Sequence, residues 1–188
     1  MTRMTRLLTV LALLIVAACA KAEPPAAGGP GGAFQLVDQN GRPATEQLLQ
    51  GRWSAVFFGF TYCPDYCPTT LQALKAAEAE LGSKARDLQV VFISVDPERD
   101  TPAALKAYLA EDVFPEGVIG LTGTPEQVAA AAKAYRAYFK KTGEGDDYLV
   151  DHTAAVYLMN PKGEFVRVLT GEMTPTEMAT QIRDAMRG

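Results

Sequence analysis

The chain has 188 residues, which is enough for one domain. Hydrophobic residues make up 48% of it, so it can build a core, and its formal net charge is −4 at neutral pH. An acidic chain without a basic footprint argues against nucleic acid as a partner.

Segment 1–18 predicts a lipoprotein signal peptide. Arg3 and Arg6 give it a positive start, and the apolar run Leu7–Ala18 follows. A transmembrane helix needs about 20 apolar residues, so we expect this shorter run to be removed. Small residues lead up to Cys19, as in the lipobox at which bacterial signal peptidase cuts before a diacylated cysteine. Cys19 would then be a lipid anchor; the alternative is an ordinary secretory signal that leaves it a free thiol.

The rest of the chain divides into a tether and a domain. Residues 19–32 are rich in Pro, Gly and Ala and lack the bulky apolar residues that could offset the entropy of ordering, which predicts a flexible tether. Residues 33–188 make up the single domain. We therefore expect an exported lipoprotein that is anchored on the membrane and faces the periplasm or the cell exterior.

Two continuous runs of β-branched and aromatic residues predict buried central strands. They are Trp53–Phe60 and Leu88–Val95. Further strands are expected at Val118–Leu121, Ala154–Met159 and Phe165–Leu169, with an N-terminal hairpin formed by Phe34–Val37 and the turn at Asn40-Gly41.

Helical patterns alternate with these strands. Thr69–Leu81 carries apolar residues at helical spacing, and Gly82 is placed to end that helix. Later helices are expected from Thr101-Pro102 to Leu109, from Thr124-Pro125 to Tyr138, and after Thr174-Pro175, because a capping residue followed by proline opens each. The alternation favours an α/β domain with a largely parallel central sheet.

Cys63 and Cys67 fall where a central strand gives way to a helix, the edge of an open α/β sheet where functional groups collect. We expect Cys63 just outside the helix, Pro64 in its first turn, and Cys67 one turn later. Both sulfurs would face the same side and could chelate an ion or close a disulfide. The helix dipole favours the thiolate form, so both thiols should be more acidic than a free cysteine, whose pKa is about 8.5.

His152 is the one histidine of the chain and follows a polar stretch, Lys140–Asp147, which we interpret as a loop. Two thiolates and an imidazole suit copper, because the soft thiolates favour Cu(I) and the imidazole serves either oxidation state. Asp96 or Asp151 could orient the imidazole ring. A structural disulfide and a zinc site are the alternatives; the short loop between the cysteines and the missing fourth ligand count against them.

At three motifs the chain resembles the Sco/SenC family of copper chaperones of respiratory oxidase assembly. The motifs span the whole mature domain in order. They are Cys63-Pro-Asp-Tyr-Cys67-Pro, Ser94-Val-Asp96-Pro-Glu-Arg-Asp100-Thr-Pro, and Tyr148-Leu-Val-Asp151-His152-Thr with Tyr157-Leu behind it.

The resemblance implies a thioredoxin-like α/β fold, with a central mixed β-sheet flanked by helices and an N-terminal β-hairpin. It implies one copper ion on Cys63, Cys67 and His152, and a cysteine pair that cycles between dithiol and disulfide. It also implies delivery of copper to, or thiol reduction at, the binuclear copper centre of cytochrome c oxidase. The partners would be its copper-bearing subunit and other periplasmic copper carriers or thiol reductants. Two departures are Thr153, where serine is common, and a lipobox in place of the usual transmembrane anchor.

Three functions remain open from the sequence. A metallochaperone, which is not an enzyme, is the leading hypothesis. A thiol-disulfide oxidoreductase is its rival, although the three residues between the cysteines depart from the usual CxxC motif and His152 has no place in a purely redox role. The third is a peroxiredoxin-like peroxidase.

Overall fold

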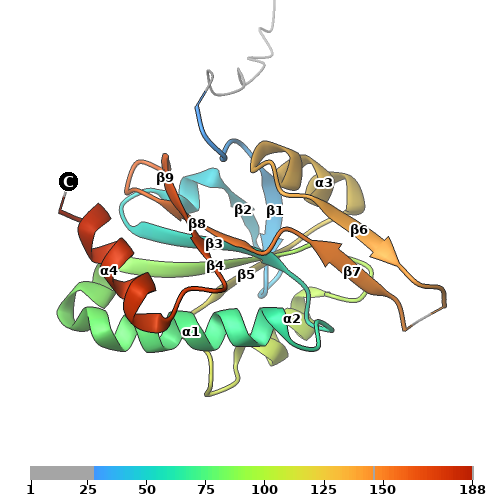
Figure 1. Ribbon diagram of the computed structural model, residues 1–188. Helices are drawn as coiled ribbons and strands as arrows, with labels where there is room; N and C mark the ends of the chain where they lie inside the picture. The colour runs from blue at the N-terminus through green and yellow to red at the C-terminus, as the bar shows by residue number, and fades with distance from the viewer. Residues whose placement is uncertain (1–27, 146, 188) are drawn as a thin grey trace, which may run out of the picture.

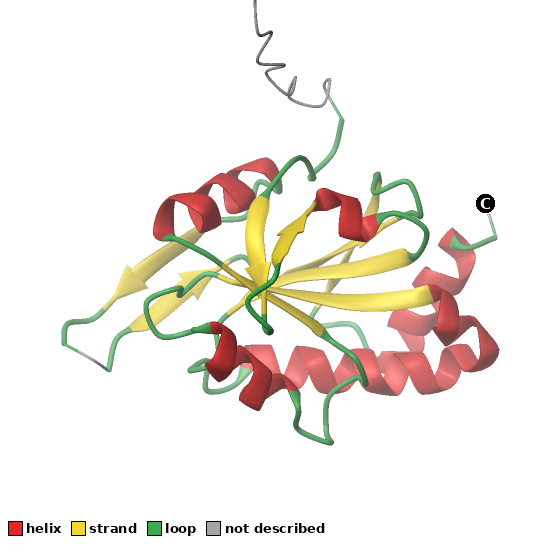
Figure 2. Ribbon diagram, turned by 180° about the vertical axis from the view of Figure 1, so that it is seen from behind, coloured by secondary structure: helices red, strands yellow, loops and turns green. Residues whose placement is uncertain are grey.

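The computed structural model describes residues 28–145 and 147–187. The predicted signal peptide, Cys19 and most of the tether lie outside the described residues. A seven-stranded sheet in the order β2-β1-β5-β4-β3-β8-β9 forms the centre, with α1, α2 and α4 on one side and α3 on the other (Figures 1 and 2). The strands are β1 (Gln35–Asp38), β2 (Pro43–Thr45), β3 (Trp53–Gly59), β4 (Leu88–Ser94), β5 (Ile119–Thr122), β8 (Ala155–Met159) and β9 (Phe165–Thr170).

The sheet is mixed, as the family resemblance implied, but it is not largely parallel. Among the described strands, β3 pairs in parallel with β4, and β4 with β5. The other pairings in the sheet are antiparallel, because the hairpins β1–β2 and β8–β9 extend it on both sides. The apolar runs of β3 and β4 indicated buried strands correctly, but burial alone does not set strand direction.

The core sits on the two central strands. Phe57 and Phe58 of β3 are fully buried, as are Val91 and Ile93 of β4. Successive side chains of a strand point to opposite faces, so both faces of the sheet must be covered at this point. The helices on the two sides provide that cover and make β3 a fixed base for the segment that follows it.

Four α-helices flank the sheet in the described part of the chain, and three of them begin as predicted. At the start of each of the three, a threonine hydroxyl accepts a hydrogen bond from a backbone amide of the first turn and a proline follows. The fourth, α1, has no side-chain cap at Asp65 and begins earlier than the predicted Thr69. The helices are α1 (Tyr66–Leu81), α2 (Pro102–Leu109), α3 (Pro125–Ala134) and α4 (Pro175–Ala185), and short 3-10 helices span Glu46–Leu49 and Gly82–Asp87.

A two-stranded ribbon, β6 (Phe139–Thr142) with β7 (Leu149–His152), projects beside the main sheet (Figure 1). The predicted continuation of α3 to Tyr138 is wrong, because Arg136 adopts a left-handed backbone with φ 55° and turns the chain away. The predicted loop Lys140–Asp147 is wrong only at its start, because Lys140, Lys141 and Thr142 belong to β6.

The residues of β7 alternate between buried and exposed positions. Tyr148, just before the strand, and Val150 are buried, whereas Leu149 and Asp151 are exposed. This period of two is that of a strand with one covered face. His152 is therefore the last residue of a strand and lies on the same face as Val150.

None of the described helices is long and apolar enough to cross a membrane.

Candidate metal centre

The two cysteines lie where β3 passes into α1. Cys63 is in the turn between them, and its amide donates to the Phe60 carbonyl at 3.2 Å. Cys67 is the second residue of α1 and is completely buried, while Cys63 is partly exposed. Pro64 lies outside the helix and not in its first turn, because Asp65, with φ −143° and ψ −64°, is not helical and the helix begins at Tyr66.

The two thiols have opposite ionisation behaviour. Hydrogen bonds from the Cys67 thiol, from His152 and from the Cys67 amide, which lies 3.4 Å from the Cys63 sulfur, lower the pKa of Cys63 to about 4 against opposing burial. Burial, and then the nearby Cys63 sulfur, raise the pKa of Cys67. The prediction that both thiols are acidic is therefore wrong for Cys67, because its loss of solvent outweighs the helix dipole.

His152 reaches this pair from the ribbon. Its Nε2 lies 3.5 Å from the Cys67 sulfur, and the three donor atoms of Cys63, Cys67 and His152 all lie within 4.8 Å of one another. Its Nδ1 lies 3.2 Å from the carbonyl oxygen of Thr153. A carbonyl only accepts, so Nδ1 carries a proton, and Nε2 is the nitrogen that a metal would use.

The Thr153 carbonyl contacts the imidazole, whereas the hydrogen bonds described for Asp96 go to other side chains. Asp151 is exposed on the ribbon, where it lies opposite Lys140 in the register of β6 and β7. Asp96 is 3% exposed and accepts hydrogen bonds from Tyr148 and Arg99. Asp151 faces away from the metal centre because neighbouring residues of a strand, here Asp151 and His152, point to opposite faces.

Aromatic side chains enclose the imidazole on the protein side. The ring centroids of Phe57, Phe60 and Tyr66 lie 6.2, 5.8 and 6.1 Å from that of His152, all in edge-type arrangements. The position of Tyr66 between the two cysteines could have marked it in the sequence. Nothing in the linear pattern separates Phe57 from its equally buried neighbour Phe58. The histidine is thus packed, and not free on a loop.

Gly59 makes room for the buried sulfur. A β-carbon at this position would lie 2.8 Å from the Cys67 sulfur and 2.9 Å from the Phe92 ring. Any larger residue would displace one of them, so the last residue of β3 must be glycine for Cys67 to occupy its place.

The donor set fits a soft transition metal. Two sulfurs and an imidazole nitrogen suit copper, and hard cations such as Mg²⁺ prefer oxygen ligands. One thiol is already poised as thiolate, and the other would lose its proton on coordination, since metal binding releases ligand protons. The same two sulfurs could alternatively form a disulfide.

Comparisons with known proteins agree with this geometry. The SCO1/SenC family model matches residues 22–187. The chain is 41% identical over 167 residues to SenC of Rhodobacter capsulatus, covering 88% of this chain and 75% of that protein. It is 46% identical over 149 residues to the mitochondrial SCO1 homolog 1 of Arabidopsis thaliana, covering 77% of this chain and 44% of that longer protein.

A solved structure matches as well. The copper-bound ScoI of Bradyrhizobium japonicum is 43% identical, with a TM-score of 0.75, and the match covers 83% of this chain and 99% of that one. The family match spans most of the sequence, and the fold matches that of a solved relative over the same domain. The chain therefore belongs to the SCO1/SenC family.

Proposed function

We propose that this protein is a copper metallochaperone that delivers copper to the binuclear copper centre of cytochrome c oxidase during assembly. The observation that carries the proposal is the convergence of two cysteine sulfurs and a histidine nitrogen within 4.8 Å, from segments 85 residues apart. The copper-bound state of the ScoI relative supports the choice of metal. The proposed partners are the copper-bearing oxidase subunit and periplasmic copper carriers or thiol reductants, with a lipid at Cys19 holding the protein on the membrane.

The burial of the three donors suits transfer better than permanent storage. Cys67 is buried, but Cys63 and His152 are each partly exposed. An open hollow borders them, lined in part by Pro64, Leu149 and Ala154. A ligand from a partner can therefore approach the metal from this side while Cys67 holds it from beneath.

Thiol-disulfide exchange is the second candidate, favoured by the asymmetry of the cysteines. The partly exposed, acidic Cys63 thiolate would attack a target disulfide and form a mixed disulfide, releasing one target thiolate. Cys67, once deprotonated, would then attack Cys63, close the Cys63–Cys67 disulfide and release the second target thiolate. The target gains the two electrons that this protein loses.

A metal titration with parallel redox measurement tests the proposal. The reduced protein should bind one copper ion, and the Cys63–Cys67 disulfide should abolish binding because a bonded sulfur is no longer a thiolate ligand. His152→Ala should weaken copper binding while Cys63 and Cys67 still exchange; Cys63→Ser should lose both. Cells with His152→Ala should lose oxidase assembly almost as fully as cells with Cys63→Ser. Normal oxidase activity and normal copper affinity in the His152→Ala variant would favour thiol-disulfide exchange over copper delivery as the function.

A further inference from the structure

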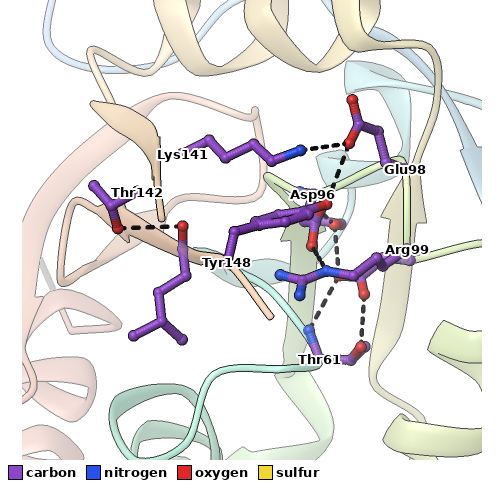
Figure 3. Close-up of polar contacts among 10 residues, drawn as sticks. Thr61, Asp96, Glu98, Arg99, Lys141, Thr142 and Tyr148 are labelled. Carbon is purple, nitrogen blue, oxygen red and sulfur yellow. Dashed lines mark hydrogen bonds and ion pairs between the residues drawn. The ribbon is translucent and has the colours of Figure 1, made fainter. Parts of the chain in front are cut away.

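The segment from Ser94 to Asp100 touches both halves of the candidate metal centre. It begins at the last residue of β4 and lies between the turn that carries Cys63, which we call the cysteine turn, and the β6–β7 ribbon, as Figure 3 shows for its contacts with Thr61 and Tyr148. Ser94, Asp96 and Asp100 are all buried. Buried polar side chains are costly unless they are hydrogen-bonded, so these contacts define the segment's position.

The first group of contacts, or arm, is made by Asp100 and holds the cysteine turn. Asp100 accepts from the Thr61 hydroxyl at 2.6 Å and from the Thr61 amide at 3.1 Å. Its Oδ2 also accepts from the Ser94 hydroxyl at 2.6 Å, and the Ser94 oxygen in turn accepts from the Asp96 amide at 3.0 Å. Thr61 is two residues before Cys63, so the carboxylate fixes the backbone that leads into the turn.

The other arm holds the ribbon. The Tyr148 hydroxyl donates to Asp96 Oδ1 at 2.6 Å, and the second oxygen of Asp96 accepts from Arg99 Nε at 2.5 Å. Tyr148 lies four residues before His152, so in an extended chain the two side chains point to the same face. The Tyr148 hydroxyl also lies 3.3 Å from Glu98 Oε2, so the short bond to Asp96 and this longer contact connect the histidine-bearing ribbon to the segment that holds the cysteine turn.

Two cations reinforce the second arm. The Arg99 guanidinium lies 3.6 Å from the centroid of the Tyr148 ring, and the Lys141 ammonium also lies 3.6 Å from it. Figure 3 shows the two cations on opposite sides of the ring. Lys141 also pairs with Glu98 at 3.0 Å, a second link between ribbon and segment. Tyr148 is thus clamped both at its hydroxyl and on its ring.

The ribbon needs such a clamp because it has no place in the main sheet. Within the described chain, β6 and β7 form a separate two-stranded sheet. Backbone ladders between the two sheets do not fix the ribbon, and an isolated two-stranded ribbon is marginal in water. Side-chain contacts therefore help to set the distance between His152 and the sulfurs, together with the short connection from His152 to β8.

We infer that Tyr148 and Asp96 are positioning residues for the metal centre: their hydrogen bond holds the ribbon where His152 completes the donor set. This inference rests on the proposed copper binding. Removing the bond should loosen the imidazole ligand and leave the cysteine turn in place, because the Asp100–Thr61 arm is separate. Partners that orient metal ligands typically change metal affinity by about 10–100-fold, and a loss in that range is expected here.

Tyr148→Phe is the direct test, because it removes the hydroxyl and keeps the ring between Arg99 and Lys141. Ser54→Ala is a matched control: it deletes a buried hydroxyl that is 2.9 Å from Gln89, near the opposite end of β3 from the cysteine turn. Copper affinity of the purified, reduced protein should fall for Tyr148→Phe and stay unchanged for Ser54→Ala. Paramagnetic resonance of the Cu(II) form should show weakened imidazole nitrogen coupling, and the Cys63–Cys67 potential should not move.

Asp96→Asn and the double variant show whether the two residues act through one bond. The double variant should lose no more affinity than the more severe single variant, as expected for coupled partners. Amide hydrogen exchange of the metal-free protein provides a readout that does not depend on copper. Residues 139–142 and 149–152 should exchange faster in Tyr148→Phe than in the wild type, and Ser54→Ala should not change them.

The outcomes separate the inference from the proposed function. A wild type that binds no copper would refute the proposed function, whereas ribbon exchange would still test the clamp. Unchanged ribbon exchange in Tyr148→Phe would overturn the inference on its own. Wild-type copper affinity with wild-type nitrogen coupling in this variant would also overturn it, even where the wild type binds copper tightly.

Discussion

Gly59 lies directly against Cys67, so close that a β-carbon on the glycine would stand 2.8 Å from the cysteine sulfur. The strand that anchors the site therefore limits the position of its most buried ligand. Both residues are fully enclosed by the core, where neighbouring atoms cannot simply move into solvent.

Gly59→Ala should consequently displace the Cys67 sulfur and weaken copper binding, at a cost of about 1–3 kcal/mol in unfolding free energy from overpacking. Gly120→Ala is the matched control, because its β-carbon would crowd Leu109 at 2.5 Å in the same sheet without touching a cysteine. Calorimetry and copper competition should show both variants destabilised and only the first impaired in binding. Equal copper affinities for the two would contradict the role given to Gly59.

Cys63 should react with iodoacetamide before Cys67 in the reduced, metal-free protein. Because the pKa of Cys63 is about 4, its alkylation rate should be nearly constant from about pH 6 to 9, where an ordinary thiol gains reactivity as it ionises. Cys67, buried and with a raised pKa, should react only on unfolding. Peptide mass spectrometry measures both rates, and denatured protein is the control. A Cys63 rate that climbs steeply above pH 7 would refute this.

Glu78, on α1, should make stability depend on pH. Burial raises its pKa from 4.5 to about 7, although Arg52 and Lys75 oppose the shift. A carboxyl with a raised folded pKa holds its proton more tightly when folded, so its stabilising contribution is complete below pH 4.5 and is lost as pH rises through 7.

Glu78→Gln keeps this position neutral and should raise the melting temperature above pH 7 but not near pH 4.5. Solvent screening of a half-buried carboxyl limits the gain to about 1 kcal/mol, or ~2–4 °C for a domain of this size. The exposed Glu116→Gln is the control and should leave the melting temperature unchanged at either pH. A gain for Glu78→Gln that is the same at both pH values would show that charge burial is not its cause.

Cys19→Ser should release the protein from membranes or block its processing, because Cys19 is the predicted acylation site and residues 19–32 the predicted tether. Membrane fractionation with mass spectrometry of the mature N-terminus measures both. An unmodified Cys19 within an intact leader would exclude lipidation. Unaltered membrane association of the variant would point to a different anchor.

The sequence was most informative where local patterns decide the structure. The buried runs of β3 and β4 and the Thr-Pro helix starts depend on neighbours along the chain, and they were predicted to within a few residues. The three donors were also identified, because sulfur and imidazole chemistry is visible in the residue types. Their mutual distances needed the fold.

The ribbon was missed because its structure depends on distant partners. Lys140–Asp147 is polar and contains glycine, which is typical of a loop, and the hydroxyl of the flanking Tyr148 donates to Asp96, 52 residues earlier. The partners of Asp96 were missed for the same reason: its carboxylate accepts from Tyr148 and Arg99 and not directly from the imidazole. Residue spacing cannot show which of several possible partners a buried carboxylate takes.

The start of α1 has a further consequence. Three helices are capped by threonine hydroxyls, but at α1 the amide of Cys67 donates to the sulfur of Cys63. The thiolate thus takes the place of a capping oxygen, and the first turn of α1 is strongest when that sulfur is free and negatively charged.

In the metal-free protein, the ionisation and oxidation of Cys63 are therefore coupled to the stability of α1. Because the pKa of Cys63 is lowered, its thiolate stabilises the fold fully above pH 9.0, the pKa of an ordinary cysteine, and this stabilisation is lost as pH falls through about 4. Forming the disulfide neutralises the same sulfur and so weakens the cap. The stability of the first turn of α1 therefore depends on whether the Cys63 sulfur is reduced.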